Sequence, residues 1–360
     1  MATYRYLVGD LLTNTILAEL PFFGVSFSRR LNKPGNCTAS FLLGNSQFRD
    51  QDTIDATVPG RTAFWVERNG ILVWGGILWS RTYQSQSNSL QFTGQTFESF
   101  FFKQFIEANF NKVTIDQRTI LVDLVTAMQA KTGANIGILY PEAFGGTPVN
   151  RTVNFYPYQN WSFGKAIEYM INYSDGFDYT IEVGYDGSGN PTKTLTTDNK
   201  LGVSAAATQI AFDYPGNIKN YWYPESASNA AVSMLGFGAG EEALTLMSKV
   251  TISALLTAGY PDLQESYSNR DVSVQATLDS QTQTASTLAE VPMIVPTFET
   301  NPEMEPIFGS YSLGDYVNIN IEDPRFPNGK IISTRIIGYD AKPTSAETQE
   351  EVKLVTSGEE

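Results

Sequence analysis

The stretch that decides the fold reads Pro59-Gly-Arg-Thr-Ala-Phe-Trp-Val-Glu-Arg-Asn-Gly-Ile-Leu-Val-Trp-Gly-Gly-Ile-Leu-Trp-Ser-Arg-Thr-Tyr83. Apolar and polar residues alternate on both sides of Asn69-Gly70, which is typical of half-buried strands. Asn-Gly with no spare residue on either side predicts a type I′ hairpin turn, because that turn needs positive φ at both positions. This register places Trp65 opposite Trp74 and Val66 opposite Val73. Gly75-Gly76 is expected to break the second strand as a bulge or sharp bend.

Further strand-like runs surround this hairpin along the chain. Together they predict strands at 3–9, 15–20, 23–31, 36–43, 61–68, 71–83 and 88–93. Seven short strands at this spacing are typical of a barrel or sandwich, so we expect a closed or nearly closed antiparallel sheet. The period then changes, because Phe97, Phe101 and Phe105 recur every four residues. They predict a buried helix over 93–105, with the three rings in the core.

The next segment combines helices and strands. Asp116 is a good N-cap for a helix over 117–131, which Lys131 and Gly133 would close, and a second helix is predicted over 162–173. Their apolar stripes are Ile120, Leu121, Leu124, Val125 and Met128 in the first helix, and Phe163, Ala166, Ile167, Met170 and Ile171 in the second. Strands are predicted at 136–140, 151–156, 177–185 and 192–198. These elements predict a small α+β domain inserted after the first sheet.

Strand signals return in the last part of the chain. They lie at 208–213, 218–224, 230–238, 292–299, 315–321, 331–340 and 349–356. A polar helix is predicted from about 271 to 289, with a narrow apolar stripe of Val274, Leu278, Ala285 and Leu288. Because the other helix positions are mostly Gln, Thr and Ser, we expect it to lie on a surface or against a partner.

These patterns predict a mainly β chain with α+β insertions. The predicted division is a first barrel-like sheet with a flanking helix, an inserted α+β domain, a second barrel-like sheet in two pieces, a helical insertion between those pieces, and an acidic tail. The corresponding ranges are 1–107, 108–205, 206–239 with 292–356, 240–291 and 357–360.

Composition excludes several classes of function. The 360 residues include no histidine and one cysteine, Cys37, so neither a histidine-based nucleophile pair nor an ordinary zinc site can be built. A formal net charge of −14 argues against binding nucleic acid through phosphate neutralisation and against anionic membranes. No signal-peptide pattern and no apolar run of membrane-spanning length is present. We therefore expect synthesis in a cytoplasm and no membrane insertion by this chain.

The residues that could carry chemistry also fit simpler structural roles. Close carboxylates occur at Asp175 and Asp178, at Glu241 and Glu242, and at Asp213 before Tyr214, but none lies in a recognisable catalytic motif. Asp186-Gly-Ser-Gly-Asn190 mimics part of a calcium loop and is interpreted as a hairpin turn. Gly236-Phe-Gly-Ala-Gly240 lacks the ending of a phosphate-binding loop. We accordingly predict no catalytic, cofactor-binding or metal-binding residue, no cofactor and no enzymatic activity.

Five tryptophans and eighteen tyrosines could stack on sugars. The tryptophans are Trp65, Trp74, Trp79, Trp161 and Trp222. We favour packing between sheet and helix, because large aromatic side chains are highly buried on average.

Several motifs, in order and spacing, resemble a known family. They are Gly24-Val-Ser-Phe-Ser-Arg-Arg-Leu-Asn32, Pro59-Gly-Arg-Thr-Ala63, Val73-Trp-Gly-Gly-Ile77, Gly259-Tyr-Pro-Asp-Leu263 and Leu313-Gly-Asp-Tyr-Val317. The chain resembles, over nearly its whole length, the minor tail proteins of long-tailed actinobacteriophages, which are similar to phage baseplate hub proteins.

The resemblance implies a specific architecture and role. It implies two tail-tube-like antiparallel β-barrels per chain and a homotrimer whose six barrels form a ring around the DNA channel at the tail tip of the virion. DNA would pass through the lumen without specific binding. The implied partners are the distal tail (ring) protein, the tape measure protein and other minor tail or fibre proteins. Two alternatives stay open, a tail-tip protein that binds or cleaves host glycans and a soluble β-rich carbohydrate-binding module.

Overall fold

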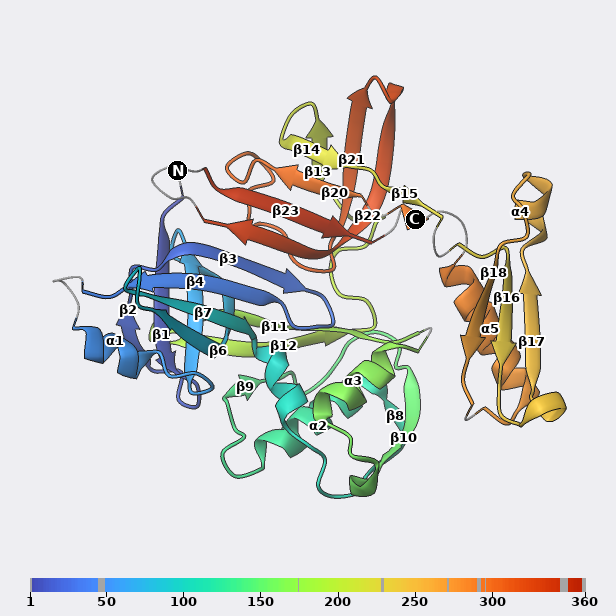
Figure 1. Ribbon diagram of the computed structural model, residues 1–360, viewed down its shortest axis with the longest axis horizontal. Coiled ribbons are helices and arrows are strands. Elements are labelled where there is room, and N and C mark those ends of the chain that lie inside the picture. The colour runs from blue at the N-terminus through green and yellow to red at the C-terminus, as the bar shows by residue number, and fades with distance from the viewer. Residues whose placement is uncertain are drawn as a thin grey trace. The chain divides into compact units, whose positions relative to one another are not determined.

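The computed structural model describes residues 2–44, 49–173, 175–227, 230–270, 272–289, 293–294, 296–343 and 349–357. The chain forms two compact units (Figure 1). The larger unit comprises residues 1–220 and 298–356, and the smaller unit comprises residues 221–297 and 357–360. Residues 358–360 of the predicted acidic tail lie outside the described residues.

A mainly antiparallel sheet runs through the larger unit, in the order β14-β20-β23-β22-β3-β4-β7-β6-β5-β1-β2, with β21 attached to β22 and β13 to β21. These strands are β1 (Tyr4–Asp10), β2 (Ile16–Glu19), β3 (Phe23–Arg30), β4 (Asn36–Leu42), β5 (Thr62–Arg68), β6 (Ile71–Gln84), β7 (Ser89–Thr96), β13 (Ala211–Tyr214), β14 (Ile218–Trp222), β20 (Thr297–Thr300), β21 (Tyr316–Asp323), β22 (Phe326–Lys342) and β23 (Glu351–Thr356). The predicted mainly β class is confirmed.

The two predicted sheets are continuous with each other. Strand β3 pairs antiparallel with β22, from Arg30 opposite Gly338 to Phe27 opposite Ala341. Within the described residues no closed barrel is formed, and β13 pairs with β21 in parallel, so the pairing is not antiparallel throughout. The sequence could not reveal the junction, because its two strands lie about 300 residues apart.

The Asn69-Gly70 turn is confirmed, but the predicted cross-strand register is wrong by one residue. Asn69 and Gly70 have φ of 51° and 85°, as a type I′ turn requires. Glu67 lies opposite Leu72 as predicted, but a bulge at Val73 then places Val66 opposite Trp74 and Trp65 opposite Gly75. Strand β6 continues through the glycines, where a Cβ on Gly75 would lie 2.9 Å from the Trp65 ring. Gly75 therefore makes room for Trp65 rather than ending the strand.

The predicted helix over 93–105 is shorter and of another type. Strand β7 extends to Thr96, and a 3₁₀ helix, η1 (Phe97–Lys103), follows it. Phe97 and Phe101 are fully buried, as expected, whereas Phe105 lies beyond the helix and is 45% exposed. The burial of the first two rings was predicted correctly, although for another reason: every residue from Phe97 to Phe101 is buried, on all sides of the 3₁₀ helix.

The α+β segment packs on this sheet. Its helices α2 (Gln117–Gln129) and α3 (Phe163–Ile171) confirm the two predicted helices, and Asp116 and Ser162 accept their N-cap hydrogen bonds from Arg118 N and Lys165 N. Its strands are β8 (Phe110–Asp116), β9 (Ile138–Leu139), β10 (Asn150–Phe155), β11 (Asp178–Tyr185) and β12 (Pro191–Asp198). Strand β8, like helix α1 (Asp50–Ala56), was not predicted.

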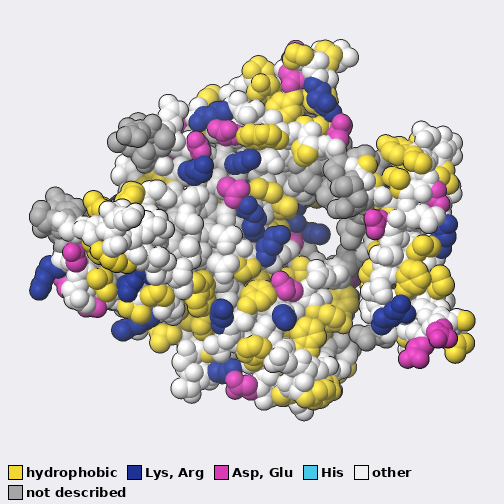
Figure 2. Space-filling view, in the orientation of Figure 1, with side chains coloured by type: hydrophobic (Ala, Val, Ile, Leu, Met, Phe, Trp, Pro, Cys, Tyr) yellow, Lys and Arg dark blue, Asp and Glu magenta, His cyan; other side chains and the backbone are white. Residues whose placement is uncertain are grey.

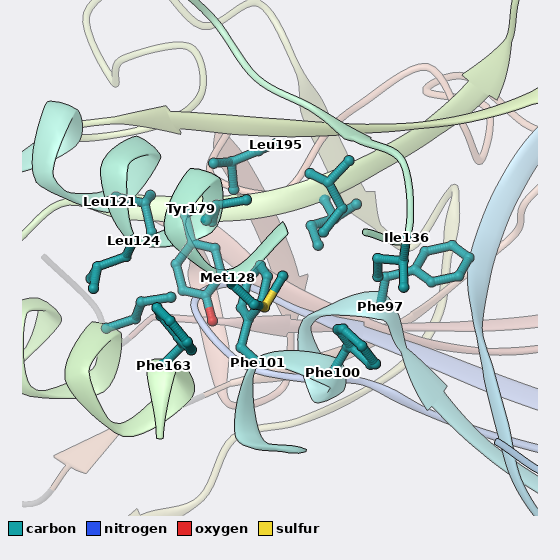
Figure 3. Close-up of a cluster of buried hydrophobic side chains, with 14 of the residues drawn as sticks. Phe97, Phe100, Phe101, Leu121, Leu124, Met128, Ile136, Phe163, Tyr179 and Leu195 are labelled. Carbon is teal, nitrogen blue, oxygen red and sulfur yellow. The ribbon is translucent and has the colours of Figure 1, made fainter. Parts of the chain in front are cut away.

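One hydrophobic core joins this segment to the first strands of the chain (Figure 3). It contains the apolar stripes of α2 and α3, the rings of η1, and residues of β1, β5, β6, β11 and β12. Phe101, Phe163 and Tyr179 point toward one another in its centre (Figure 3). The α+β segment is therefore part of the larger unit, because its buried residues belong to the same core as those of β1, β5 and β6.

The smaller unit contains a three-stranded sheet in the order β17-β16-β18, with α5 packed on one face. Its elements are β15 (Glu225–Ser226), β16 (Ser233–Phe237), η3 (Glu242–Leu244), β17 (Met247–Thr251), α4 (Ser253–Thr257), β18 (Gln264–Ser268), α5 (Gln275–Leu288) and β19 (Met293–Ile294). Strand β16 thus pairs within 233–268, and the prediction that 230–238 joins the second sheet is wrong.

Helix α5 begins at Gln275, and the predicted stripe is only partly confirmed: Leu278 is fully buried and Ala285 half-buried. Its buried side chains are Leu278, Thr282 and Ser286, whereas Val274 is 58% exposed. A Cβ on Gly236 would lie 2.0 Å from Thr282 Oγ1, so the helix approaches the sheet closely at that glycine. The side chain of Leu288 lies outside what the structure describes.

Candidate functional site

The two carboxylates Asp175 and Asp178 have opposite environments. Asp178 is 4% exposed and accepts hydrogen bonds from Arg335 Nη2 (2.5 Å), Asn32 Nδ2 (2.9 Å) and Leu201 N (3.1 Å). Asp175 has an exposed side chain and pairs with Arg151. The two groups therefore have separate structural partners.

Asp178 lies where three segments of the larger unit meet. Asn32 follows β3, Asp178 begins β11, and Arg335 belongs to β22. Arg335 also donates to the carbonyl oxygens of Gly314 (2.7 Å) and Leu201 (2.5 Å). A buried ion pair with all its partners satisfied adds little net stability, but removing one member leaves a buried charge unpaired. We call Asp178, Arg335 and Asn32 the Asp178 junction.

A second ion pair, between the buried Arg29 and the half-buried Glu182, joins β3 to β11. Arg29 donates to Glu182 Oε2 (2.8 Å), to Thr180 Oγ1 (2.8 Å) and to Ile181 O (3.2 Å). Burial by itself raises the pKa of Glu182, but the charge of Arg29 outweighs this effect and the pKa is lowered. Glu98 Oε1 accepts from Ile181 N (2.8 Å), and burial raises the pKa of Glu98. Arg29 and Glu98 thus bind the edge of β11, which would otherwise present unpaired backbone groups.

A third ion pair, with both side chains buried, joins β5 to the C-terminal segment. Arg68 binds Glu350 through two parallel hydrogen bonds of 2.8 and 2.9 Å, and donates to Phe308 O (3.0 Å) and Pro302 O (3.2 Å). The Tyr4 hydroxyl also donates to Glu350. This bidentate geometry fixes orientation as well as distance.

Lys193 is buried without a carboxylate at ion-pair distance within the described residues. Its Nζ donates to Leu11 O and Ile136 O, each at 2.7 Å, and lies 4.5 Å from the centroid of the Phe97 ring. Burial lowers the pKa of Lys193 from 10.5 to about 7. The lysine connects the β1–β2 loop to the segment before β9.

The other candidates lie apart from one another. Asp186 accepts from Ser188 N and Asn190 N at 2.8 Å each, and these bonds lower its pKa and close the β11–β12 turn as predicted. Asp213 accepts from Asn320 Nδ2 at 2.7 Å. Glu241, Glu242 and the glycine-rich segment 236–240 lie at the β16–β17 hairpin. No group of three or more Cys, Asp or Glu in the described ranges could hold a metal ion.

The tryptophans mostly pack inside the larger unit, as predicted. Trp65 and Trp74 are fully buried, and Trp74 Nε1 donates to Ser28 O at 2.9 Å. Trp79 donates to Ser99, and the Trp161 ring lies 5.3 Å from that of Phe155. Trp222 is 43% exposed. Cys37 is buried, and burial raises the pKa of its thiol.

Sequence reasoning missed the buried arginines and the buried lysine. Arg29, Arg68 and Arg335 each lie in a strand beside buried neighbours, and a cation inside an apolar strand was the available signal. Their acidic partners could not be chosen among 38 acidic residues.

None of the helices in the described part of the chain combines the length and apolar character needed to cross a bilayer.

At the level of sequence, no protein-family model and no curated protein matches the chain. Solved structures do match it. A tail protein from Neisseria meningitidis has a TM-score of 0.64 and 11% identity, over 98% of this chain and 96% of that one. The 43 kDa tail protein of prophage MuSo2 from Shewanella oneidensis has a TM-score of 0.61 and 11% identity, over 98% of both chains. An E. coli component of the type VI secretion system, described as structurally similar to the T4 tail proteins gp27 and gp5, has a TM-score of 0.52 and 7% identity, over 100% of this chain and 75% of that one.

These matches extend over nearly the whole chain and include both units. They confirm the predicted resemblance at the level of the fold, whereas the link to actinobacteriophages stays a prediction. The chain has the fold of phage tail proteins and of proteins that resemble baseplate hubs.

Proposed function

We propose that the chain is a structural protein of the phage tail tip, where it joins the distal tail tube to fibre or receptor-binding proteins. The observation that carries this proposal is the end-to-end match to two phage tail proteins, which cover the same length as this chain. A chance likeness of one common domain would cover only part of the chain.

The proposed assembly is a homotrimer that forms a ring around the DNA channel. Each chain would contribute two barrel-like sheets, one built around β1–β7 and the other around β20–β23. The six sheets of three chains would then match the sixfold symmetry of the tail tube. The continuous pairing of β3 with β22 supports a fixed relation between these two sheets. Closed cyclic symmetry is the usual solution for such assemblies.

The net charge suits a DNA channel. With −14 per chain, three chains carry about −42, and like charge keeps phosphates from making persistent contacts. We expect a neutral to acidic lumen. The distal tail protein, the tape measure protein and other minor tail or fibre proteins are the proposed neighbours, and no catalytic role is assigned to the chain.

A reconstruction of the virion tail tip would test this proposal. Three copies of the chain should surround the channel, and a count of one or six at this position would contradict it. Electrostatics calculated on that assembly should show no lining dominated by Lys and Arg. In parallel, purified protein should release no reducing sugar from host cell walls. Release that one carboxylate substitution abolishes without unfolding would favour the hydrolase alternative instead.

A further inference from the structure

The smaller unit is inserted into a hairpin of the larger one. Strands β14 and β20 are neighbours in the large sheet, and the chain between them forms the smaller unit. The connecting segments β15 and β19 pair antiparallel, with Glu225 opposite Ile294 and Ser226 opposite Met293. An insertion of this kind enters and leaves at one point, so the host sheet does not need it for its own strand order.

The charge of the inserted segment is strongly one-sided. Between residues 221 and 297, Lys249 and Arg270 are the two basic residues against eight acidic ones. A surface of this composition attracts basic partners and repels acidic ones.

One end of this unit exposes apolar side chains from the β16–β17 hairpin and from the start of α5. Leu244 is 85% exposed, Met247 is 57% exposed, and Val274 is 58% exposed. Gln275 Nε2 donates to Met247 O at 3.0 Å, which holds the start of α5 beside β17. We call Leu244, Met247 and Val274 the apolar tip.

The loop that carries the tip is fixed by its backbone. Gly238 N donates to Leu246 O (2.8 Å), Leu246 N to Ala239 O (2.9 Å), and Ala239 N to Val272 O (2.8 Å). Glu242 has a φ of 50°, a conformation that non-glycine residues seldom adopt and that other contacts must hold. The exposure of Leu244 is therefore built into the hairpin.

Two acidic side chains and one basic side chain lie beside the tip. Glu241 and Glu242 are exposed beside Leu244, and with Phe237, Met247 and Arg270 they line an open hollow of about 610 Å³. Figure 2 shows hydrophobic and acidic side chains together at this end of the unit. Exposed apolar groups with a charged rim are typical of protein docking surfaces, where a few apolar anchors supply most of the binding energy.

We propose that the smaller unit is a docking module whose apolar tip inserts into an apolar pocket, rimmed by lysine and arginine, on a neighbouring protein of the same tail. This inference rests on the proposed function, because the neighbour is a tail protein. The acidic rim of Glu241 and Glu242 selects the charge of the partner, and Leu244 and Met247 supply the buried contact.

The test uses phage whose gene for this chain carries the double substitution Leu244→Asp and Met247→Asp. A second phage carries Glu241→Lys and Glu242→Lys, and the matched control carries Leu256→Asp. Leu256 is 41% exposed on α4, at the opposite end of the same unit (Figure 1). Because all five side chains are exposed, the variants should fold, and circular dichroism of the purified chains checks this. Particles are purified and their proteins quantified by mass spectrometry.

We expect both tip variants to keep this chain at its normal copy number and to lose one neighbouring tail protein at least ten-fold, while the control keeps it. Unchanged particle composition would overturn the proposal, as would an equal loss in the control. Loss of this chain itself would also overturn it, by showing that the tip contacts a second copy. If the Leu244→Asp, Met247→Asp phage loses the neighbour and the Glu241→Lys, Glu242→Lys phage keeps it, the proposed basic rim of the partner is refuted. Absence of the unsubstituted chain from particles would instead contradict the proposed function.

Discussion

Replacing Asp178 by asparagine should destabilise the larger unit, because it leaves the buried Arg335 of the Asp178 junction without its counter-charge. Asp178 Oδ2 accepts from Arg335 and Leu201, and its Oδ1 accepts from Asn32. In Asp178→Asn one of these oxygens becomes an NH₂ group, which cannot accept a hydrogen bond from the donor that it faces. Arg335 keeps its charge in a site where its side chain is 7% exposed. Leaving such a charge unpaired costs about 3–5 kcal/mol of unfolding free energy.

The neighbouring carboxylate provides the control. Asp175 pairs with Arg151 at the surface, where its side chain is 56% exposed. The same substitution at Asp175 should cost less than about 1 kcal/mol, because exposed ion pairs contribute little. Urea unfolding followed by tryptophan fluorescence suits the comparison, because four of the five tryptophans belong to the larger unit.

A double substitution distinguishes the unpaired charge from general damage. Adding Arg335→Met to Asp178→Asn removes the stranded charge, so the pair should be less destabilised than the sum of the single variants. Equal midpoints for Asp178→Asn and Asp175→Asn, or strict additivity in the double variant, would refute the reasoning.

Three further predictions use other features of the larger unit. Gly70→Val should cost about 1–2 kcal/mol, because only the positive φ opposes it, whereas Gly187→Val at an open position without positive φ should be near neutral in the same urea assay. The pKa of Lys193 is lowered to about 7, so between pH 7 and 10.5 the unfolded chain binds more protons than the folded chain. The free energy of unfolding should therefore rise with pH over this range. Lys193→Met should lose that rise when unfolding is measured at pH 7 and pH 9.5. Cys37, buried and with a raised pKa, should stay unreactive to Ellman's reagent at pH 8 until denaturant is added, and fast reaction of the native protein would contradict its burial.

Local signals predicted local structure well. Asn69-Gly70 gave the turn, and Asp116 and Ser162 gave the helix starts, because each acts on backbone groups within a few residues. The register beyond the turn was not predictable in the same way. The bulge at Val73 brings Trp65 opposite Gly75, where the ring has room. This packing depends on neighbours outside the hairpin, so the turn sequence does not predict it.

Long-range pairing was the main source of error. Strand β16 reads like the strands of the second sheet, yet it pairs with β17 and β18 in a segment where exposed polar residues hide the alternation. The junction of β3 with β22 likewise joins segments with no shared local signal. Of the candidate site residues, Asp178 proved important, but for a structural reason that the sequence did not indicate.

Three ion pairs of buried arginines, those of Arg29, Arg68 and Arg335, join segments that lie far apart in the sequence. Arg29 pairs with a residue 153 positions away, Arg335 with one 157 positions away, and Arg68 with one 282 positions away. Each pair can form only after distant segments have docked. If one of these segments docks elsewhere, the buried arginine is left without its carboxylate. Apolar contacts are non-directional and tolerate shifted packing, whereas a buried charge with several hydrogen-bond partners does not. We therefore infer that these pairs discriminate against misdocked arrangements more than they add to stability, and so help to hold the sheets of the larger unit in one arrangement.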